Sequence, residues 1–364
     1  MYESTYNLQI KSTRGSKSAT EELSKRRELI KSTGLTSIHN EDICLVMCDE
    51  IISKVKYINT AISKINTNKS IVKKNVIIDA YTSATIEGAR TTVEEVVDIL
   101  SKQECTNINK SNQMVINTIK ACNIAYESNI TIKNIRKIWE IITYRVCENE
   151  GLKGEKFRNG MVYIGNNIRI VHTPCEASKI ESKMQEMFNW ALHSNIDTLI
   201  KSCILHFYTA YIHPFCDGNG RIARLLNSSY LIHNGYINIK YVSISESINN
   251  ELTMYYKALK DSEYTYNNIL DITPFIDYML DRICDSIDTT ISKYNKLSDK
   301  QLMLLQKMKN NGKNSEITVE KASRITKLSL CSTRNLLNKL VDMQYLTKFK
   351  QGRMCIYKLK NKGE

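Results

Sequence analysis

The chain has 364 residues, of which 3 are proline and 13 are glycine. This length allows two or three domains with a sizeable core, and the scarcity of helix-breaking residues favours a mostly helical fold. No apolar run approaches the length of a membrane span, and the N-terminal region lacks the hydrophobic stretch of a signal peptide, so we expect a cytoplasmic protein without membrane contact. The 11 cysteines include no C-x-x-C pair and are typical of free thiols in a reducing compartment.

Positive charge is concentrated towards the C-terminal end of the sequence. Residues 298–364 contain 15 Lys and Arg against 5 Asp and Glu, which gives ten of the 13 net positive charges of the chain. The rest of the sequence is nearly neutral. A basic terminal segment on a nearly neutral body indicates two separate functions.

The first half of the chain predicts a polar arm followed by helices. Residues 1–35 are polar and basic, and we expect a flexible basic arm there. Amphipathic spacing then predicts helices over about 41–65, 72–87, 92 onward, 108–126 and 131–147. Gly88 is placed to end the second of these helices in the C′ position, and Thr92 with Glu95 forms a capping box at the start of the third.

The helical pattern is interrupted between Gly151 and Gly165. Two short β-prone runs, Met161–Ile164 and Ile168–Val171, flank Gly165-Asn166-Asn167 and predict a β-hairpin. Helical spacing returns over about 176–194, 197–212, 222–233, 246–260 and 272–293. The body of the chain is therefore expected to be helical with one inserted hairpin.

The basic segment 298–364 has its own order of elements. It predicts, in turn, a helix over 299–310, a strand at 317–319, helices over 320–326 and 329–343, and a hairpin over 345–359. This order is similar to that of a winged helix-turn-helix, and with the positive charge it indicates binding of duplex DNA. Ser332, Arg334 and Asn335 are then expected to face the major groove, with Arg353 on the wing. A small basic domain that binds another protein is the alternative.

Residues 211–224, YIHPFCDGNGRIAR, gather a histidine, a carboxylate and two arginines around a turn. Gly218, Asn219 and Gly220 precede a helix, and glycines allow successive backbone N–H groups to converge on one point. The N-terminus of a helix also attracts anions. This turn is therefore suited to hold phosphate.

The charged side chains around the turn fit the same chemistry. Arg221 and Arg224 are three residues apart and can each donate two hydrogen bonds to phosphate oxygens. Asp217 is a hard carboxylate ligand, suited to a Mg²⁺ ion that phosphates already hold in part. His213 can act as a base near neutral pH. The stretch predicts a nucleotide phosphate site with a base that faces an incoming hydroxyl.

The residues from His213 to Arg224, HPFCDGNGRIAR, match every fixed position of H-P-F-x-D/E-G-N-G-R-x-x-R, the signature of the Fic family. The helical region over about 75–285 resembles the Fic fold as well. The hairpin resembles the family's target-positioning flap, with Val162, Tyr163 and Ile164 on its first strand. The fold class that we expect is therefore mostly α, a Fic-type helical core with a β-hairpin flap and a C-terminal winged helix-turn-helix.

This resemblance implies transfer of AMP from ATP to a Ser, Thr or Tyr hydroxyl of a protein, with ATP and Mg²⁺ bound at the motif. By the resemblance, His213 takes the proton of the target hydroxyl and Asp217 holds Mg²⁺ against the phosphates. Arg221 steadies the phosphate chain. By the same resemblance, Asn219 and the backbone amides of Gly218 and Gly220 hold the α-phosphate region. The kinase-like branch of the family carries Lys where this chain has Gly220, so phosphoryl transfer is disfavoured.

A second motif lies N-terminal to the core. Residues from Ser83 to Gly88, SATIEG, fit S/T-x-x-x-E-G/N, the signature of the family's inhibitory helix. Ser83 and Glu87 are four residues apart and share one helix face. The resemblance implies that Glu87 pairs with Arg224 and denies this arginine to the γ-phosphate. An ordinary helix end closed by glycine is the alternative reading of this short motif.

The expected organisation is an arm over 1–35, an N-terminal helical region over 36–150 with the inhibitory helix at 72–88, the Fic catalytic core over 151–293, and the winged-helix-like domain over 298–364. Self-modification and a homodimer remain open. So do an enzyme that also removes AMP and a nucleotide-sensing transcription regulator. A metal hydrolase built on His206, His213 and Asp217 is a further alternative, but it leaves the glycines and arginines of the motif without a purpose.

Overall fold

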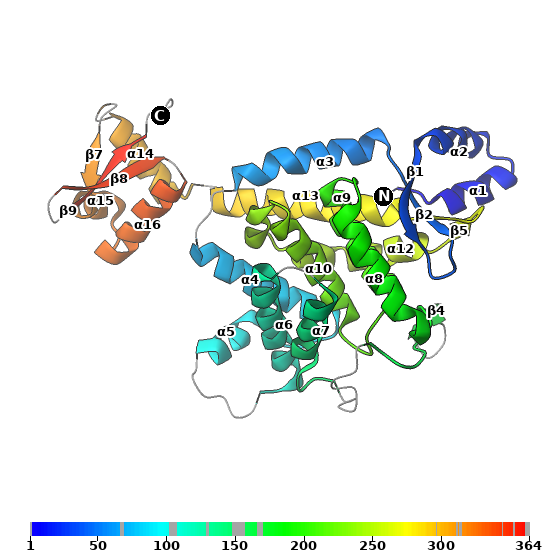
Figure 1. Cartoon of the computed structure of the whole chain (residues 1–364). Coiled ribbons are helices and arrows are strands. Elements are labelled where there is room, and N and C mark those ends of the chain that lie inside the picture. Colours follow the sequence, from blue (N-terminus) through cyan, green and yellow to red (C-terminus); the bar gives the residue numbers. More distant parts are fainter. Residues whose placement is uncertain are drawn as a thin grey trace. The chain divides into compact units, whose positions relative to one another are not determined.

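The computed structural model describes the chain at residues 2–65, 69–101, 108–128, 131–147, 157–165, 170–295, 297–310, 312, 315–343, 345–351 and 354–360. These residues form a mostly helical protein with small β-sheets (Figure 1), as the sequence predicts. The chain divides into two compact units. The first unit contains Met1–Ile62 and Val72–Ile287, and the second contains Ser63–Ile71 and Asp288–Glu364.

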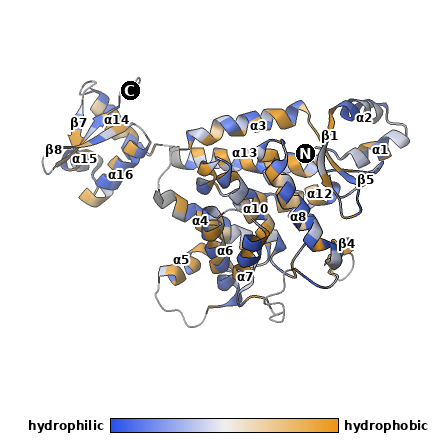
Figure 2. Cartoon of the chain, viewed as in Figure 1, coloured by the Kyte–Doolittle hydropathy of each residue, from blue (hydrophilic) through white to orange (hydrophobic). Residues whose placement is uncertain are grey.

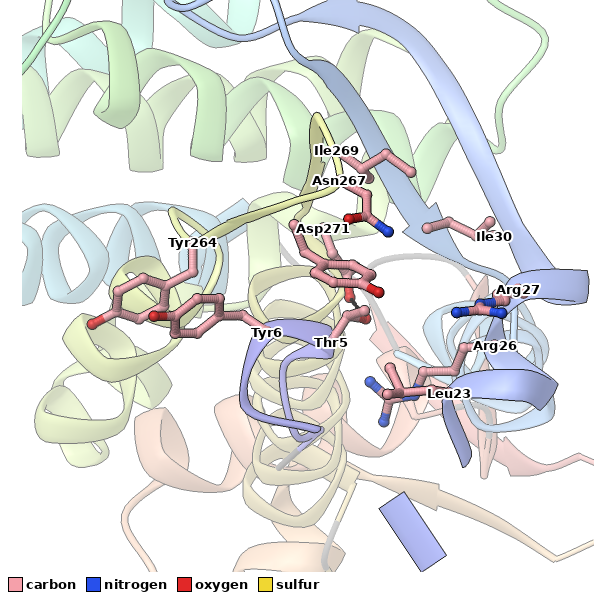
Figure 3. A pocket seen from close by; sticks show the side chains of 11 residues that line it. Thr5, Tyr6, Leu23, Arg26, Arg27, Ile30, Tyr264, Asn267, Ile269 and Asp271 are labelled. Atoms are coloured by element: carbon pink, nitrogen blue, oxygen red, sulfur yellow. Dashed lines mark hydrogen bonds between the residues drawn. The ribbon is translucent and has the colours of Figure 1, made fainter. Parts of the chain in front are cut away.

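Most of residues 2–35 lie in two helices and a strand, so the expectation of a flexible arm is wrong. They form α1 (Thr5–Thr13), α2 (Lys17–Leu29) and most of β1 (Ile30–Thr36). The rings of Tyr6 and Tyr264 stack at 4.7 Å between centroids (Figure 3). The guanidinium of the buried Arg26 lies 3.9 Å from the centroid of Tyr2. A few aromatic and cation–π contacts therefore hold a segment whose polar composition predicts disorder.

A four-stranded sheet lies beside these helices. Its strands are β1, β2 (Asp42–Val46), β6 (Ile269–Asp271) and β5 (Thr265–Tyr266), in that order, and only the β2–β6 pair is parallel. The helix expected over 41–65 is therefore wrong in its first part, since α3 begins only at Asp49 and runs to Ala61. The run that includes Ile43 and Val46 is buried on both faces of the sheet, and such a short apolar run has no periodicity that separates a strand from a helix.

Helices make up most of the rest of the first unit. Their bounds are α4 Lys69–Ile86, α5 Val93–Ser101, α6 Lys110–Glu127, α7 Ile132–Thr143, α8 Ala177–His193, α9 Thr198–Ile212, α10 Asn219–His233, α11 Ile244–Asn250, α12 Leu252–Asp261 and α13 Thr273–Asn295, with short 3₁₀ turns η1 Ile62–Lys64 and η3 Ile237–Tyr241. Most carry hydrophilic and hydrophobic residues together (Figure 2). α9 and α10 pack on each other and are buried along most of their length, so the loop between them is held from both sides.

The second unit has a hydrophobic core of its own. Its elements are α14 Asp299–Asn310, β7 Glu316–Thr318, α15 Val319–Thr326, α16 Leu330–Asp342, β8 Leu346–Gln351 and β9 Met354–Leu359. The strands form an antiparallel sheet in the order β7-β9-β8. Leu304, Leu337 and Tyr357 are completely buried at the centre of this unit. The elements follow one another in the predicted order, while Arg353 lies outside the described residues.

Two properties of the described part bear on its environment. None of its helices combines the length and the apolar character that crossing a membrane requires. Each cysteine that the structure describes is a free thiol.

Candidate active site

The loop between α9 and α10 carries the sequence motif and is braced from within. His213 ends α9 in a left-handed conformation with φ 53°, and Gly218 begins α10 with φ 82°. The backbone N–H of Phe215 donates to Asn219 Oδ1 at 2.9 Å, and Asn219 Nδ2 donates to the Phe215 carbonyl at 2.7 Å. The buried ring of Phe215 stacks on Trp139 at 5.2 Å. These contacts within the protein fix the shape of the loop.

The side chain of Asn219 braces the loop. Both polar ends of this buried side chain bond to the backbone of Phe215. The backbone N–H groups of Asn219 and Gly220 lie at the N-terminus of α10, where no carbonyl of the helix can accept from them. A side chain at Gly218 would place its Cβ 3.0 Å from Ile142 Cγ2, so this position needs glycine for space as well as for its positive φ.

Arg221 is a buried cation beside this turn. Its Nη1 donates to the carbonyl of Ile142 at 3.2 Å, and its Nη2 lies 3.4 Å from Asp217 Oδ1. Its Nε is buried without a partner among the described residues. Burial lowers the pKa of Arg221, which means that the charged form is not fully compensated. A buried guanidinium in this condition favours a bound anion.

Asp217 lies at the rim of the same turn. Its side chain is 45% exposed. The backbone N–H of Gly218 donates to its Oδ1 at 2.6 Å, and Trp139 Nε1 donates to its carbonyl at 3.0 Å. The carboxylate is thus oriented by its own backbone and remains open to solvent.

Arg224 is paired with the helix that carries the second motif. Its Nε donates to Ser83 Oγ at 2.9 Å, and its Nη2 donates to the Ser83 carbonyl at 2.9 Å and to Glu87 Oε1 at 2.8 Å. Burial is the largest single influence and works to lower the pKa of Arg224, but the charge and hydrogen bond of Glu87, together with Tyr255 and Tyr256, leave this pKa raised. The ion pair expected between Glu87 and Arg224 is present. A Cβ at Gly220 would overlap the Glu87 carboxylate, so this carboxylate lies directly against the N-terminal turn of α10.

His213 is placed as a proton acceptor. Its Nδ1 lies 3.3 Å from the carbonyl of Ala210, and a carbonyl can only accept a hydrogen bond. Nδ1 therefore carries the proton, and Nε2 keeps its lone pair. Burial lowers the pKa of His213 to about 4. The neutral imidazole that a general base requires is the form present at neutral pH.

Arg158 contacts the backbone of the same loop, although no motif in its own stretch of sequence pointed to it. Its buried guanidinium donates to the His213 carbonyl at 2.8 Å, to the Gly160 carbonyl at 2.7 Å and to the carbonyl of Cys175. Its backbone N–H donates to the Pro214 carbonyl at 3.0 Å. It holds the His213 backbone at the end of α9, where a cation is favoured. Contacts to carbonyls from distant segments leave no signal in a single sequence.

A cavity of about 220 Å³ opens beside His213. Its lining residues are Glu87, Ile164, His172, Ala210, His213, Gly220, Arg224, Tyr255, Tyr256, Leu259, Lys260 and Glu263. His213, the paired arginine and two residues of the hairpin, Ile164 and His172, therefore face a common space.

The hairpin is present but shorter than predicted. β3 (Ile164–Gly165) pairs with β4 (Ile170–His172) in antiparallel register. Ile164 lines the cavity, Val162 is partly buried, and Tyr163 is 61% exposed. The turn at Asn166-Asn167 lies outside the described residues. Both strands of the hairpin thus reach the cavity beside His213, β3 through Ile164 and β4 through His172.

The arrangement contradicts the metal-hydrolase alternative. His206 is completely buried, and its Nε2 lies 2.9 Å from the hydroxyl of Tyr255. Asp217 contacts Gly218 and Arg221 instead of joining the two histidines. Within the ranges that the structure describes, no three His, Cys, Asp or Glu side chains are grouped to hold a metal ion.

The fold and the loop define a helical protein in which a buried histidine of lowered pKa adjoins the uncapped N-terminus of a helix. Residues 129–231 match the Fic/DOC family. Protein adenylyltransferase Fic of Drosophila erecta is 27% identical over 237 residues, which is 62% of this chain and 44% of that protein. Its counterpart in Drosophila willistoni is 25% identical over 256 residues, or 68% and 48%. The chain thus spans less than half the length of these curated relatives.

Solved structures show the same fold. A Fic family protein from Desulfovibrio desulfuricans G20 has a TM-score of 0.61 and 22% identity, over 88% of this chain and 98% of that one. A Fic domain containing signaling protein from Bacteroides thetaiotaomicron VPI-5482 has a TM-score of 0.52 and 18% identity, over 67% and 97%. The chain thus shares the fold of these Fic family structures, and its residues 129–231 match the Fic/DOC family.

Proposed function

We propose that this protein transfers AMP from ATP to a Ser, Thr or Tyr hydroxyl of a protein, and that Glu87 restrains this activity. The observation that carries the proposal is the position of the Glu87–Arg224 ion pair, which lies against the helix N-terminus and in the same cavity as His213. The curated relatives named protein adenylyltransferase Fic support the choice of reaction.

The reaction follows from the free Nε2 of His213. This atom takes the proton of the target hydroxyl, and the hydroxyl oxygen attacks the α-phosphorus of ATP. The bond from the α-phosphorus to the bridging oxygen breaks, and pyrophosphate leaves with the electron pair. A base in this position contributes roughly 10²–10⁴-fold to such a step. Arg221 and the N-terminal amides of α10 would stabilise the negative charge on the phosphates.

Mg²⁺ fits this site as an ion that the nucleotide brings with it. Asp217 offers a single, half-exposed carboxylate, which is too little to hold the ion alone and enough to complete a shell of phosphate and water oxygens. When bound, Mg²⁺ neutralises part of the phosphate charge. The buried Arg221 Nε without a described partner is consistent with an anion at this place.

The restraint acts through Arg224. While Nη2 of Arg224 donates to Glu87 Oε1, this donor is not available to a γ-phosphate. The Glu87 carboxylate also lies against Gly220, where it would repel phosphate oxygens. ATP would then bind with its α-phosphate out of line with the hydroxyl, which removes the alignment on which the rate depends.

The target would be held by the hairpin. An extended segment of another protein can pair with an exposed strand edge through its main chain, without a requirement for sequence. Tyr163, 61% exposed, and Ile170, 55% exposed, flank this edge. The same geometry permits self-modification. Removal of AMP by water that Glu87 orients is a second activity of this site that the same assay would detect.

The test is mass spectrometry of the full chain after incubation with Mg-ATP and a cell lysate. We expect an added AMP on lysate proteins or on the chain itself in Glu87→Gly, and much less in wild type. Glu87→Gly combined with His213→Ala is the matched control, because it keeps the open site and lacks the base. Equal AMP addition by the control and by Glu87→Gly would contradict the role of His213, and no addition by any variant would contradict the reaction.

We propose a separate role for the second unit, binding of duplex DNA through a winged helix-turn-helix. The N-terminal half of α16 supports it, because Ser332, Arg334 and Asn335 are exposed there on one short stretch. Lys348 and Lys350 of β8 add charge on a strand of the wing hairpin. A nucleotide-sensing regulator of transcription would combine both units.

A further inference from the structure

A second cavity lies where the N-terminal helices meet the hairpin of β5 and β6 (Figure 3). Its volume is about 130 Å³, and its described lining residues all belong to the first unit. One side comes from α1, α2 and the start of β1, and the other comes from the segment between Tyr264 and Asp271. These lining residues include none of those at the cavity beside His213. The second cavity is therefore a separate candidate site.

Most of the wall of this cavity is aromatic or aliphatic. The rings of Tyr6 and Tyr264 are stacked with 14° between their planes and form one flat part of the wall. Leu23, Ile30 and Ile269 add aliphatic surface. An apolar cavity of roughly 150 Å³ is enough to hold a benzene ring. This cavity is of similar size, so it has room for a single ring.

Two polar side chains at this cavity have no partner. Arg27 of α2 and Asn267 of the turn between β5 and β6 are exposed, and neither side chain bonds to any residue that the structure describes. Figure 3 shows the guanidinium of Arg27 on the side of the cavity opposite to Tyr6 and Tyr264. A guanidinium and an amide nitrogen both donate hydrogen bonds. The cavity thus offers free donors beside an apolar space, which is the usual composition of a small-molecule site.

The other charged groups at the cavity are already paired. The buried Arg26 donates from Nε to Glu22 Oε1 at 2.9 Å. The two carboxylate oxygens of the buried Asp271 accept from the hydroxyls of Thr5 and Thr273. A cationic ligand would therefore find no free carboxylate among the described lining residues. The charge that remains available there is positive and favours an anion.

We propose that this cavity binds an organic anion in which one aromatic ring is joined to a carboxylate. The ring lies against the stacked tyrosines, where burial and aromatic contact stabilise it. The carboxylate accepts two parallel hydrogen bonds from Arg27 and one from the amide of Asn267. The same chemistry occurs in a free aromatic acid and at the C-terminus of a polypeptide that ends in Phe or Tyr. This binding does not depend on the proposed AMP transfer.

The location of binding is tested by titration of the full chain, labelled with ¹³C at isoleucine methyl groups, with phenylacetate as the probe. A bound ring shifts the methyl signals of Ile30 and Ile269 in the wall, and Ile30→Val and Ile269→Val assign these signals. Ile237 of η3, 61% exposed and not a lining residue, is the internal control. We expect saturable shifts at the two wall residues alone, with a Kd on the order of 1 mM for a ligand of this size. Wall signals that do not move, or that move without saturation, overturn the proposal.

The need for a carboxylate is tested with phenylacetamide, which has the same shape without the charge and should bind about tenfold more weakly. Arg27→Gln changes an exposed side chain and should weaken the binding of phenylacetate by about the same factor, without an effect on phenylacetamide. Arg14→Gln removes the same charge from an exposed position outside the cavity and is the matched control. Equal affinity for the two probes, or an equal loss in the two variants, would show that no carboxylate is recognised at Arg27.

The source of the ligand is tested with N-acetyl-Gly-Phe, which has the ring and the carboxylate of a polypeptide C-terminus. Tighter binding of this peptide than of phenylacetate supports a polypeptide as the ligand, and the reverse order supports a free acid. Ile269→Phe fills part of the cavity without a change of charge and should weaken both by about tenfold or more. If this variant does not fold, the comparison of Arg27→Gln with Arg14→Gln still decides. Undiminished binding by a folded Ile269→Phe protein contradicts binding in this cavity.

Discussion

At the scale of single residues, burial determines which proton form of His213 is present. The pKa of this imidazole is lowered to about 4, against about 6.5 for an exposed histidine. Its Nδ1 proton is held by the carbonyl of Ala210, so the free nitrogen is always Nε2. The same burial makes it a weaker base, and the negative charge of bound phosphate would raise its pKa again in the complex. The site thus has its reactive form ready before the nucleotide binds.

This leads to a prediction for the pH dependence of transfer. A base with a pKa of about 4 is neutral at every pH above this value, so protonation of His213 should not slow the reaction between pH 7 and pH 5. We expect kcat/KM of Glu87→Gly to fall only as the pH approaches 4, because kcat/KM reports the free enzyme. The measurement is AMP incorporation with labelled ATP over this range. A decline centred near pH 6.5 would show that His213 is not buried as described.

The comparison of sequence and structure is clearest for the motif residues. HPFCDGNGRIAR is local, since its turn, helix start and charges all lie within twelve residues, and it predicted the loop and its helix. The side chain of Asn219 could not be placed, because its partner is the backbone of Phe215 in a conformation that exists only in the folded loop. Arg158 acts on carbonyls at the end of α9 from a distant segment, so no local pattern could reveal it.

At the scale of elements, α4 is fastened at several points along its length. Asp79 Oδ1 accepts from the backbone N–H of Ser245 at 2.8 Å and lies 3.2 Å from Ser243 Oγ. Ser83 and Glu87, one and two turns further on, bind Arg224. The position of Glu87 thus depends on several contacts along α4 and not only on its ion pair with Arg224.

We expect Asp79→Ala to weaken the attachment of α4 to the rest of the unit. Removal of the carboxylate leaves the buried Ser243 and the Ser245 amide without their acceptor, which costs about 1–3 kcal/mol of stability. Basal AMP transfer should rise above wild type but stay below Glu87→Gly, because Glu87 remains. Thermal unfolding and AMP incorporation measure the two effects. Glu94→Ala, an exposed acid on α5, is the control and should change neither.

The ion pair between α4 and α10 should respond unequally to substitution at its two ends. Glu87→Gly and Glu87→Gln both remove the carboxylate charge and release Arg224, so AMP transfer should increase in both. Arg224→Ala breaks the same pair but also removes a phosphate ligand and leaves Glu87 against Gly220, so it should not gain activity. Labelled-ATP assays with matched ATP-binding titrations give this comparison. If Glu87→Gly and Arg224→Ala increased AMP transfer equally, the ion pair would only stabilise the fold.

Elements that depend on distant partners were the least predictable. α1 and α2 share a small cluster of Leu8, Ala19 and Leu23, and they are joined to the rest of the unit in part by residues more than 200 positions away, such as Tyr264 and Asp271. β2 looked like part of a helix because its pairing with β6 is not visible in its own sequence. Helices α6 to α10 were predictable because the spacing of apolar residues that indicates each helix is present in its own stretch of sequence.

At the scale of the whole molecule, the two units differ in what they contain. The first has the cavity and its titratable groups, and the second has a separate core around Leu304, Leu337 and Tyr357. The second also includes most of the net positive charge of the chain. Thr326 and Thr333 are buried between α15 and α16, so the exposed residues of α16 face away from this core. A helix with one face packed on the core and an exposed, polar N-terminal half is suited to enter a major groove.

The DNA-binding prediction rests on this charge and this helix. The full chain should bind duplex DNA with an affinity that falls roughly a hundredfold between 50 and 200 mM salt if about four phosphates are contacted, because each contact releases counterions. Arg334→Ala, on the exposed part of α16, should weaken binding by about 1–3 kcal/mol if this side chain reads a base edge. Lys307→Ala removes the same charge from the exposed face of α14 and is the matched control, with a much smaller effect. Fluorescence anisotropy with a labelled duplex measures all three. If binding is insensitive to salt, or if the two substitutions weaken it equally, α16 does not read DNA and the second unit binds a protein instead.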